Sequence, residues 1–294
     1  MNVVQEDENV SVICPVRNEA RRIEEMYLSL RSQTHQNWIL YFGDNASDDG
    51  TLEIVSRLAS TDKRCVVNSF VEPMPIHDNF MRTIDWALES VTGNYIQFLA
   101  GDDILGDELY LSTAISALKQ KEAVIACGKV QGFTDDSPVQ SHDFGVLASL
   151  TEGHDRKHYA IRNYWTCNLI YGFYDAQHFV KTLRSPLGSF TPNLSSDWWF
   201  SYIASETAKI TYSSDLVYRK YRKPIEYNSA HYSLQQGRKR TPPPWMHVFT
   251  FPWKQLGDRS KVLGLLPSLK LASLFQAREL RAAYARLVSK KLST

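Results

Sequence analysis

The stretch VSVICPVRNEARRIEEMYLSL, residues 10–30, contains one strand signal followed by one helix signal. Its first five residues, Val10–Cys14, are mostly apolar and β-branched, which is typical of a buried strand, and Pro15 is expected to end that strand. Asn18 is expected to cap a helix, because the apolar residues after it recur at intervals of three or four. Those residues are Ile23, Met26, Tyr27 and Leu30.

The same alternation of strand and helix continues to residue 103. The predicted strands are Val10–Cys14, Asn37–Phe42, Cys65–Val71 and Tyr95–Leu99, each separated from the next by a segment of helical spacing. This order predicts an α/β fold with a mostly parallel central sheet flanked by helices, the Rossmann-like arrangement. A strand near Val124–Val130, a helix over Asp197–Ala208 and a late strand over Leu216–Tyr221 are expected to complete it, whereas residues 131–170 show no clear pattern.

Three polar loops follow predicted strands. They are Val16–Glu19, Asp44–Asp49 and Gly101–Asp103. Ligands of open parallel sheets bind beyond the carboxyl ends of the strands, so we expect these loops to converge on one edge of the sheet and to form a site there.

Asp102 and Asp103 are two adjacent carboxylates at the end of an apolar strand. They repel each other unless a cation lies nearby, and carboxylate oxygens suit Mg²⁺ or Mn²⁺, with substrate phosphates as further ligands. The alternative is that the pair caps the next helix. Asp44 could accept hydrogen bonds from a nucleobase or ribose, although an ordinary turn or helix cap would use the same residue.

Asp197 precedes two tryptophans, Trp198 and Trp199. The flat rings could pack against a sugar, and the carboxylate could act as a general base on a hydroxyl group. The alternative is a helix N-cap beside two core aromatics.

Together these motifs resemble those of the GT-A fold of family 2 glycosyltransferases. The similarity covers residues 10–110 and, less closely, 190–232. It rests on SVICPVRNE (11–19), GDNASDDGT (43–51), GNYIQFLAGDD (93–103), Asp78-Asn-Phe80, Asp197-Trp-Trp and Val217-Tyr-Arg219. Two positions depart from the family pattern: Ala100 stands where the metal motif often has its first Asp, and Asn45 stands where the nucleotide loop often has Asp.

The resemblance implies roles for individual residues. Pro15, Arg17, Glu19 and Asp44 would line the nucleotide pocket with Asp102; Asp102 and Asp103 would bind the metal, with His231 a further candidate ligand; Asp197 would be the base; and Trp198 and Trp199 would contact the sugar. The implied activity is an inverting, metal-dependent transfer of a sugar from a nucleotide-sugar donor to a hydroxyl acceptor. The resemblance implies a UDP-sugar as the donor. It implies a saccharide or lipid-linked acceptor in cell-surface polysaccharide or glycolipid assembly. A nucleotide-sugar-binding protein without transferase activity is the alternative. A dinucleotide oxidoreductase is disfavoured because the first strand is not followed by Gly-x-Gly-x-x-Gly.

Charge divides the 294 residues into parts. Residues 1–230 carry 21 basic and 30 acidic side chains, whereas residues 231–294 carry 12 basic and 2 acidic ones. We therefore expect a flexible segment 1–9, a catalytic domain 10–232 with a nucleotide-sugar half (10–110) and an acceptor half (111–232), and a basic, aromatic and helical extension 233–294. Such an extension is typical of a membrane-surface helix or of a helix packed on the domain.

The sequence contains no uninterrupted apolar run of about 18 residues, the length that a membrane-spanning helix needs. Residues 1–9 lack the pattern of a secretory signal. The four widely spaced cysteines, Cys14, Cys65, Cys127 and Cys167, are typical of buried thiols. The expected location is cytoplasmic, with the extension in contact with the inner face of the membrane, and no nucleic-acid partner is expected.

Overall fold

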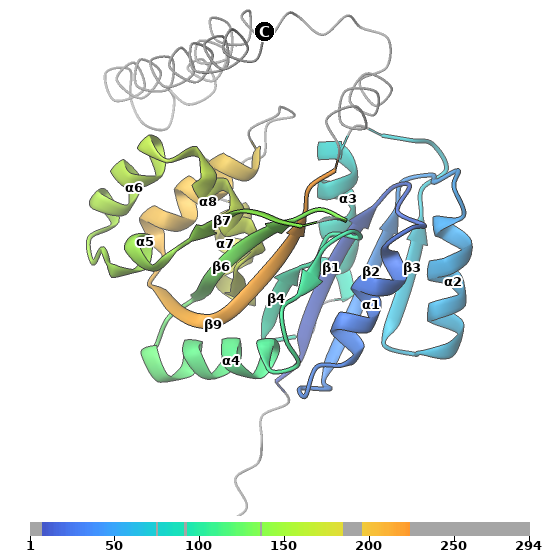
Figure 1. Ribbon diagram of the computed structural model, residues 1–294, viewed down its shortest axis with the longest axis horizontal. Helices are drawn as coiled ribbons and strands as arrows, with labels where there is room; N and C mark the ends of the chain where they lie inside the picture. The colour runs from blue at the N-terminus through green and yellow to red at the C-terminus, as the bar shows by residue number, and fades with distance from the viewer. Residues whose placement is uncertain (1–7, 75, 91–92, 136, 185–195, 224–294) are drawn as a thin grey trace, which may run out of the picture.

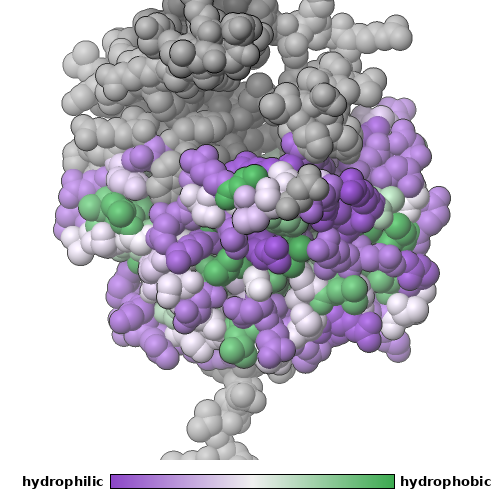
Figure 2. Space-filling model, viewed as in Figure 1, coloured by the Kyte–Doolittle hydropathy of each residue, from purple (hydrophilic) through white to green (hydrophobic). Residues whose placement is uncertain are grey.

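The computed structural model describes residues 8–74, 76–90, 93–135, 137–184 and 196–223, which form an α/β fold around one curved sheet (Figure 1). The predicted extension 233–294 lies outside the described residues, as does nearly all of the predicted flexible segment 1–9. Within the described part, no helix is both long and apolar enough to cross a membrane. On the face shown in Figure 2, hydrophobic residues are scattered among hydrophilic ones.

The first half of the sheet is parallel and has the strand order β3-β2-β1-β4. Its strands are β1 (Val10–Val16), β2 (Trp38–Asp44), β3 (Cys65–Ser69) and β4 (Tyr95–Phe98). The helices between them are α1 (Ile23–Arg31), α2 (Thr51–Thr61) and α3 (Ile76–Ser90). Figure 1 shows α1 in front of the strands and α3 behind them. Apolar side chains of β1, β2 and β4 are almost fully buried, because both faces of this part of the sheet are covered.

The second half of the sheet is mixed. Strand β8 pairs antiparallel with β4 and β6, β9 runs parallel to β6, and β5 and β7 pair antiparallel at the margins. The strands are β5 (Ile104–Leu105), β6 (Ile125–Phe133), β7 (Pro138–Asp143), β8 (Phe173–Asp175) and β9 (Ile210–Tyr221). The helices are α4 (Tyr110–Lys121), α5 (Gly145–Ser149), α6 (Gly153–Arg162), the 3₁₀ helix η1 (Tyr164–Tyr171), α7 (Ala176–Leu183) and α8 (Ser196–Thr207).

The structure corrects two details of the first strand–helix unit. Strand β1 continues through Pro15 to Val16, because the nitrogen of Pro15 faces the side on which β4 has already ended and no ladder hydrogen bond is lost. Asn18 does not cap α1. It has a positive φ of 55°, which asparagine tolerates better than most residues, and α1 begins only at Ile23.

The predicted burial of the thiols holds for the three cysteines whose side chains are described. Cys14, Cys65 and Cys127 are buried and unpaired. Burial raises the pKa of the Cys65 thiol to about 12, so this thiol stays protonated at neutral pH.

Candidate active site

The loops after β1 and β2 meet at the carboxyl edge of the sheet. The Arg17 guanidinium donates a hydrogen bond of 2.6 Å to the Asn45 carbonyl, and the Glu19 N–H donates one of 2.8 Å to the Thr51 hydroxyl. The Ala20 N–H also donates to the Asp49 carboxylate, at 3.0 Å. The two loops are therefore one connected wall, on which the structure brings Pro15, Arg17, Glu19 and Asp44 together.

Asp44 lies at the end of β2 and its side chain is fully buried. One carboxylate oxygen, Oδ2, accepts hydrogen bonds from the Ser47 N–H at 3.2 Å and from the Ser69 hydroxyl at 3.3 Å. The other oxygen, Oδ1, is buried and has no hydrogen-bond partner among the described residues. Leaving a buried acceptor unpaired costs about 1–3 kcal/mol, which makes this oxygen a candidate acceptor for a ligand's hydrogen bond.

Asn45, next to Asp44, holds the loop that follows β3. Its amide Nδ2 donates to the Met74 carbonyl and its Oδ1 accepts from the Met74 N–H, both at 2.8 Å. Only an amide can donate and accept in this way, because a carboxylate has no hydrogen to donate. This pairing gives a physical reason for asparagine at a position where the resemblance led us to expect aspartate.

Asp102 follows β4 and lies beside Glu19 from the loop after β1. The ammonium group of Lys223 is ion-paired with both: it lies 3.1 Å from Asp102 Oδ2 and in contact with Glu19 Oε1. Gly101 permits this approach, since a Cβ there would lie only 3.2 Å from Cγ of Glu19. Burial and the neighbouring Asp102 charge raise the pKa of Glu19, and the Lys223 ammonium group opposes this rise.

Asp103 is buried and points to strand β9. Its Oδ2 accepts a hydrogen bond from the Tyr218 hydroxyl and its Oδ1 accepts one from the Tyr221 N–H, both at 2.8 Å. The Tyr218 hydroxyl in turn accepts from the N–H of Ala100, the position where the family motif often has a carboxylate. Burial, with the adjacent Asp102 charge, raises the pKa of Asp103 to about 7. Asp103 thus ties the metal motif to β9, and its predicted role as a metal ligand stays a prediction.

The residues around Asp102 fit a divalent cation of the Mg²⁺ or Mn²⁺ type. Two carboxylates, Asp102 and Glu19, already surround one positive charge, and oxygen ligands of this kind suit such ions. Among the described residues no group of three or more His, Cys, Asp or Glu side chains is placed to hold a metal. The described residues would therefore supply few ligands, and substrate phosphates would supply others.

The remaining predicted site residues are less fully placed. Asp197, Trp198 and Trp199 belong to the first turn of α8, which packs against η1, α6 and α7. The roles assigned to them stay predictions, and His231 lies outside the described residues. Lys223 was not anticipated from the sequence. The available sequence signal for Lys223 was that a basic residue follows a predicted strand closely, where a strand can end at the edge of the site.

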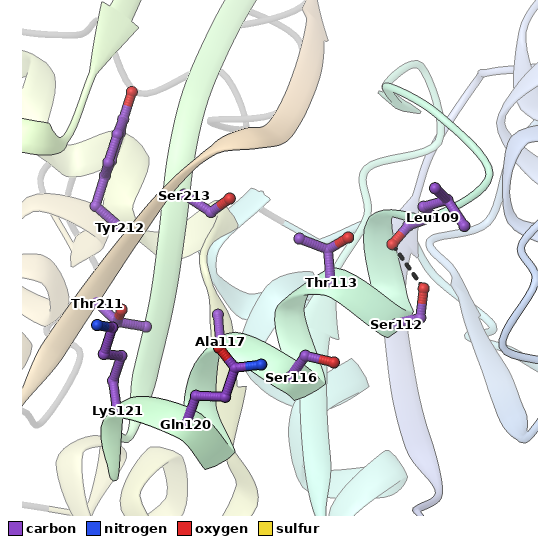
Figure 3. Close-up of a pocket in the computed structure, with 10 residues that line it drawn as sticks. All are labelled: Leu109, Ser112, Thr113, Ser116, Ala117, Gln120, Lys121, Thr211, Tyr212 and Ser213. Carbon is purple, nitrogen blue, oxygen red and sulfur yellow. Dashed lines mark hydrogen bonds between the residues drawn. The ribbon is translucent and has the colours of Figure 1, made fainter.

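A pocket of about 420 Å³ lies elsewhere, between α4 and the start of β9 (Figure 3). Its lining is rich in hydroxyl groups, and none of the predicted site residues belongs to it. The lining residues are Leu109, Ser112, Thr113, Ser116, Ala117, Gln120, Lys121, Thr211, Tyr212 and Ser213.

Comparison with known proteins identifies a family. Residues 11–177 match the family model described as glycosyl transferase family 2. An uncharacterized glycosyltransferase of Haemophilus influenzae is 31% identical over 119 residues, which are 40% of this chain and 46% of that protein. TuaG of Bacillus subtilis, whose name assigns it to teichuronic acid biosynthesis, is 31% identical over 96 residues, 32% of this chain and 36% of that protein. The matches thus span less than half the length of these relatives.

The fold also has a counterpart among solved structures. S. aureus TarS in complex with UDP-GlcNAc superimposes with a TM-score of 0.62 at 16% identity, over 93% of this chain and 73% of that chain. This likeness, with the strand order described above, confirms the predicted GT-A fold with its mostly parallel sheet.

Proposed function

The chain belongs to glycosyl transferase family 2, and we propose that it is an inverting transferase that moves a sugar from a UDP-sugar to a hydroxyl group of an acceptor. In this proposal residues 10–232 form the catalytic domain, with a donor half (10–110) and an acceptor half (111–232). Residues 233–294 form an extension that contacts the membrane surface on the cytoplasmic side.

The unpaired oxygen of Asp44 is the observation that carries the proposal. A fully buried carboxylate at the carboxyl edge of a parallel sheet is placed where nucleotides bind in such folds, and its free Oδ1 requires a hydrogen-bond donor. The imide N–H of uracil and the ribose hydroxyls are such donors. TarS, which shares the fold, holds UDP-GlcNAc, and this supports a UDP-sugar donor.

The diphosphate of the donor would lie toward Asp102. We assign Asp102 as the ligand of a divalent cation, with Glu19 beside it and Asp103 as a second candidate ligand. The cation, when bound, supplies positive charge against the charge that develops on the leaving diphosphate. Asp103 also fixes the end of β9 through its two hydrogen bonds, so its loss would disturb the site even where it does not touch the metal.

The chemistry assigned to the chain's own residues is acid–base catalysis. Asp197, in the first turn of α8, would accept the proton of the acceptor hydroxyl as that oxygen attacks the anomeric carbon. A single displacement inverts the anomeric configuration. Trp198 and Trp199, adjacent in the same turn, would offer flat surfaces for sugar rings.

The acceptor we propose is a saccharide or a lipid-linked saccharide of a cell-surface polysaccharide or glycolipid. The name of TuaG, which refers to teichuronic acid biosynthesis, supports this class of product. The basic extension 233–294 would suit an acceptor held at an anionic membrane surface, where each basic residue contributes about 1 kcal/mol.

Calorimetric titration of the full chain with UDP, GDP and dTDP, each with and without Mn²⁺, tests the donor assignment. We expect UDP to bind most tightly, with binding strengthened by Mn²⁺ in the wild type and not in Asp102→Ala. Failure of all three nucleotides to bind the folded protein would remove the donor site and, with it, the proposed transferase.

A further inference from the structure

The segment that follows strand β9 places a positive charge in the proposed donor site. Lys223, two residues beyond the end of β9, places its ammonium group between Glu19 and Asp102. These three side chains are largely shielded from solvent: those of Glu19 and Asp102 are 14% and 13% exposed, and that of Lys223 is 21% exposed. Shielding strengthens the attraction between these charges and makes an unneutralised carboxylate costly.

The chain before Lys223 is anchored, so this placement is not that of a loose surface lysine. The N–H of Tyr221 donates to Asp103, and the Tyr221 hydroxyl donates to Asp135 at 3.0 Å. The Arg22 guanidinium lies 3.7 Å from the centre of the Tyr221 ring and is itself ion-paired with Asp135. Three contacts on one residue thus fix the backbone two positions before Lys223.

Glu19 is fixed from the other side. Its N–H donates to the Thr51 hydroxyl, and its carbonyl accepts hydrogen bonds from the N–H groups of Arg22 and Ile23 at the start of α1. Glu19 is therefore held in place independently of Lys223, beside Asp102.

We propose that Lys223 is a tethered cation that occupies the place of the divalent metal on Asp102, so that the metal binds there only together with the donor diphosphate. The inference rests on the proposed function, because it assigns Asp102 to the metal. The ammonium group and the metal ion compete for the same carboxylate. A diphosphate brings new anionic oxygens, which give the displaced ammonium a partner and give the metal its missing ligands.

This competition predicts an order of affinity. Without a nucleotide, a metal ion must displace Lys223 from Asp102 and disrupt its ion pairs with the two carboxylates, so binding of the metal alone is weak. With the nucleotide, both cations have anionic ligands and the penalty is removed. Metal and nucleotide binding are therefore strongly coupled through Lys223, and the coupling is reciprocal by thermodynamic necessity.

The test measures binding of Mn²⁺ alone, by the electron paramagnetic resonance signal of the free ion, to the full-length protein. The variants are wild type, Lys223→Met, Lys223→Arg and Lys209→Met. Lys209→Met is the matched control: it removes the same charge from an exposed lysine directly before the opposite end of β9. Circular dichroism and thermal unfolding of each variant establish that it is folded.

We expect Lys223→Met to bind Mn²⁺ at least about tenfold more tightly than wild type, equivalent to about 1.4 kcal/mol. Lys223→Arg and Lys209→Met are expected to remain close to wild type. With UDP present, the difference between wild type and Lys223→Met should shrink or reverse.

Equal Mn²⁺ affinities for wild type and Lys223→Met in the absence of nucleotide overturn the inference, and this includes the case in which none of the variants binds the ion. Titration of the same proteins with UDP reports separately on the donor site. Nucleotide binding that persists while the metal affinities are equal would leave the proposed function standing and remove only the role of Lys223.

Discussion

The side chain of Asn45 and the backbone of Met74 exchange two hydrogen bonds of 2.8 Å, one in each direction. Asn45 is buried beside Asp44, so it joins the loop after β2 to the loop that leads into α3. These two hydrogen bonds fix one wall of the proposed nucleotide pocket.

Asn45→Asp should weaken both the fold and nucleotide binding. The carboxylate cannot donate to the Met74 carbonyl, and it adds a buried negative charge next to Asp44. We expect a loss of about 1–3 kcal/mol in the free energy of unfolding, measured with denaturant, together with weaker UDP binding. Met74→Ala is the control, since it leaves both backbone hydrogen bonds in place, and equal effects of the two substitutions would contradict the argument.

Asp44→Asn should reduce UDP affinity without unfolding the protein. The amide retains the shape of the side chain but loses its charge and one acceptor, and a hydrogen bond to a charged group contributes about 1.5–3 kcal/mol. Calorimetry should therefore show UDP affinity lower by about tenfold or more. Asp48→Asn, an exposed position in the same loop, is expected to bind UDP as the wild type does. An unchanged affinity in Asp44→Asn would argue against contact between Asp44 and the nucleotide.

Asp197→Asn should separate catalysis from donor binding. The amide cannot accept the proton of the acceptor hydroxyl, so we expect the turnover rate to fall by about 10²–10⁴-fold while UDP affinity stays unchanged. UDP release in the presence of acceptor measures the first quantity and calorimetry the second. A variant that retains full turnover would exclude Asp197 as the base.

Asp62, after α2, gives the fold a pH-dependent contribution. Hydrogen bonds from the Arg64 side chain, its backbone N–H and the Tyr27 hydroxyl lower the pKa of Asp62 to about 2, although burial opposes this. The carboxylate therefore stabilises the fold above its unfolded pKa of about 4, and this stabilisation is lost as the pH falls toward 2.

Asp62→Asn should accordingly lower the free energy of unfolding at pH 7, by about 1–2 kcal/mol. Unfolding measured from pH 7 to pH 2 should show the difference from wild type shrinking below about pH 4. Asp85→Asn, at an exposed position on α3, serves as the control. A difference that stayed constant across this range would mean that the charge of Asp62 is not the source of the effect.

Much of the fold over residues 10–110 could be predicted from the sequence, because its signals are local. Strands such as Tyr95–Phe98 are short apolar runs, and the helices between them repeat apolar residues at helical spacing. The insertion of β8 between β4 and β6 could not be predicted in the same way. Strand β8 has only three residues, and its place depends on partners about 50 to 80 positions away along the chain.

The candidate site was likewise predictable only where its signals are local in the sequence. The motifs around Asp44 and Asp102 were visible in the sequence, since each follows an apolar strand and parallel strands bring their carboxyl ends to one edge. The sequence did not show which group each carboxylate oxygen contacts. Asp103 turns to Tyr218 and Tyr221, whereas Asp102 meets Lys223, and these partners lie more than 110 positions further along the chain.

The sequence by itself determined the alternation of strands and helices, the positions of the polar loops and the residue types available for chemistry, because these depend on neighbours within a few positions. The tertiary structure alone decided that Oδ1 of Asp44 is left without a partner and that Asn45 clasps Met74. It alone also decided that a lysine two residues beyond β9 forms ion pairs with both Glu19 and Asp102. Hydrogen bonds and ion pairs act over a few ångströms in space, and only folding brings such distant residues that close.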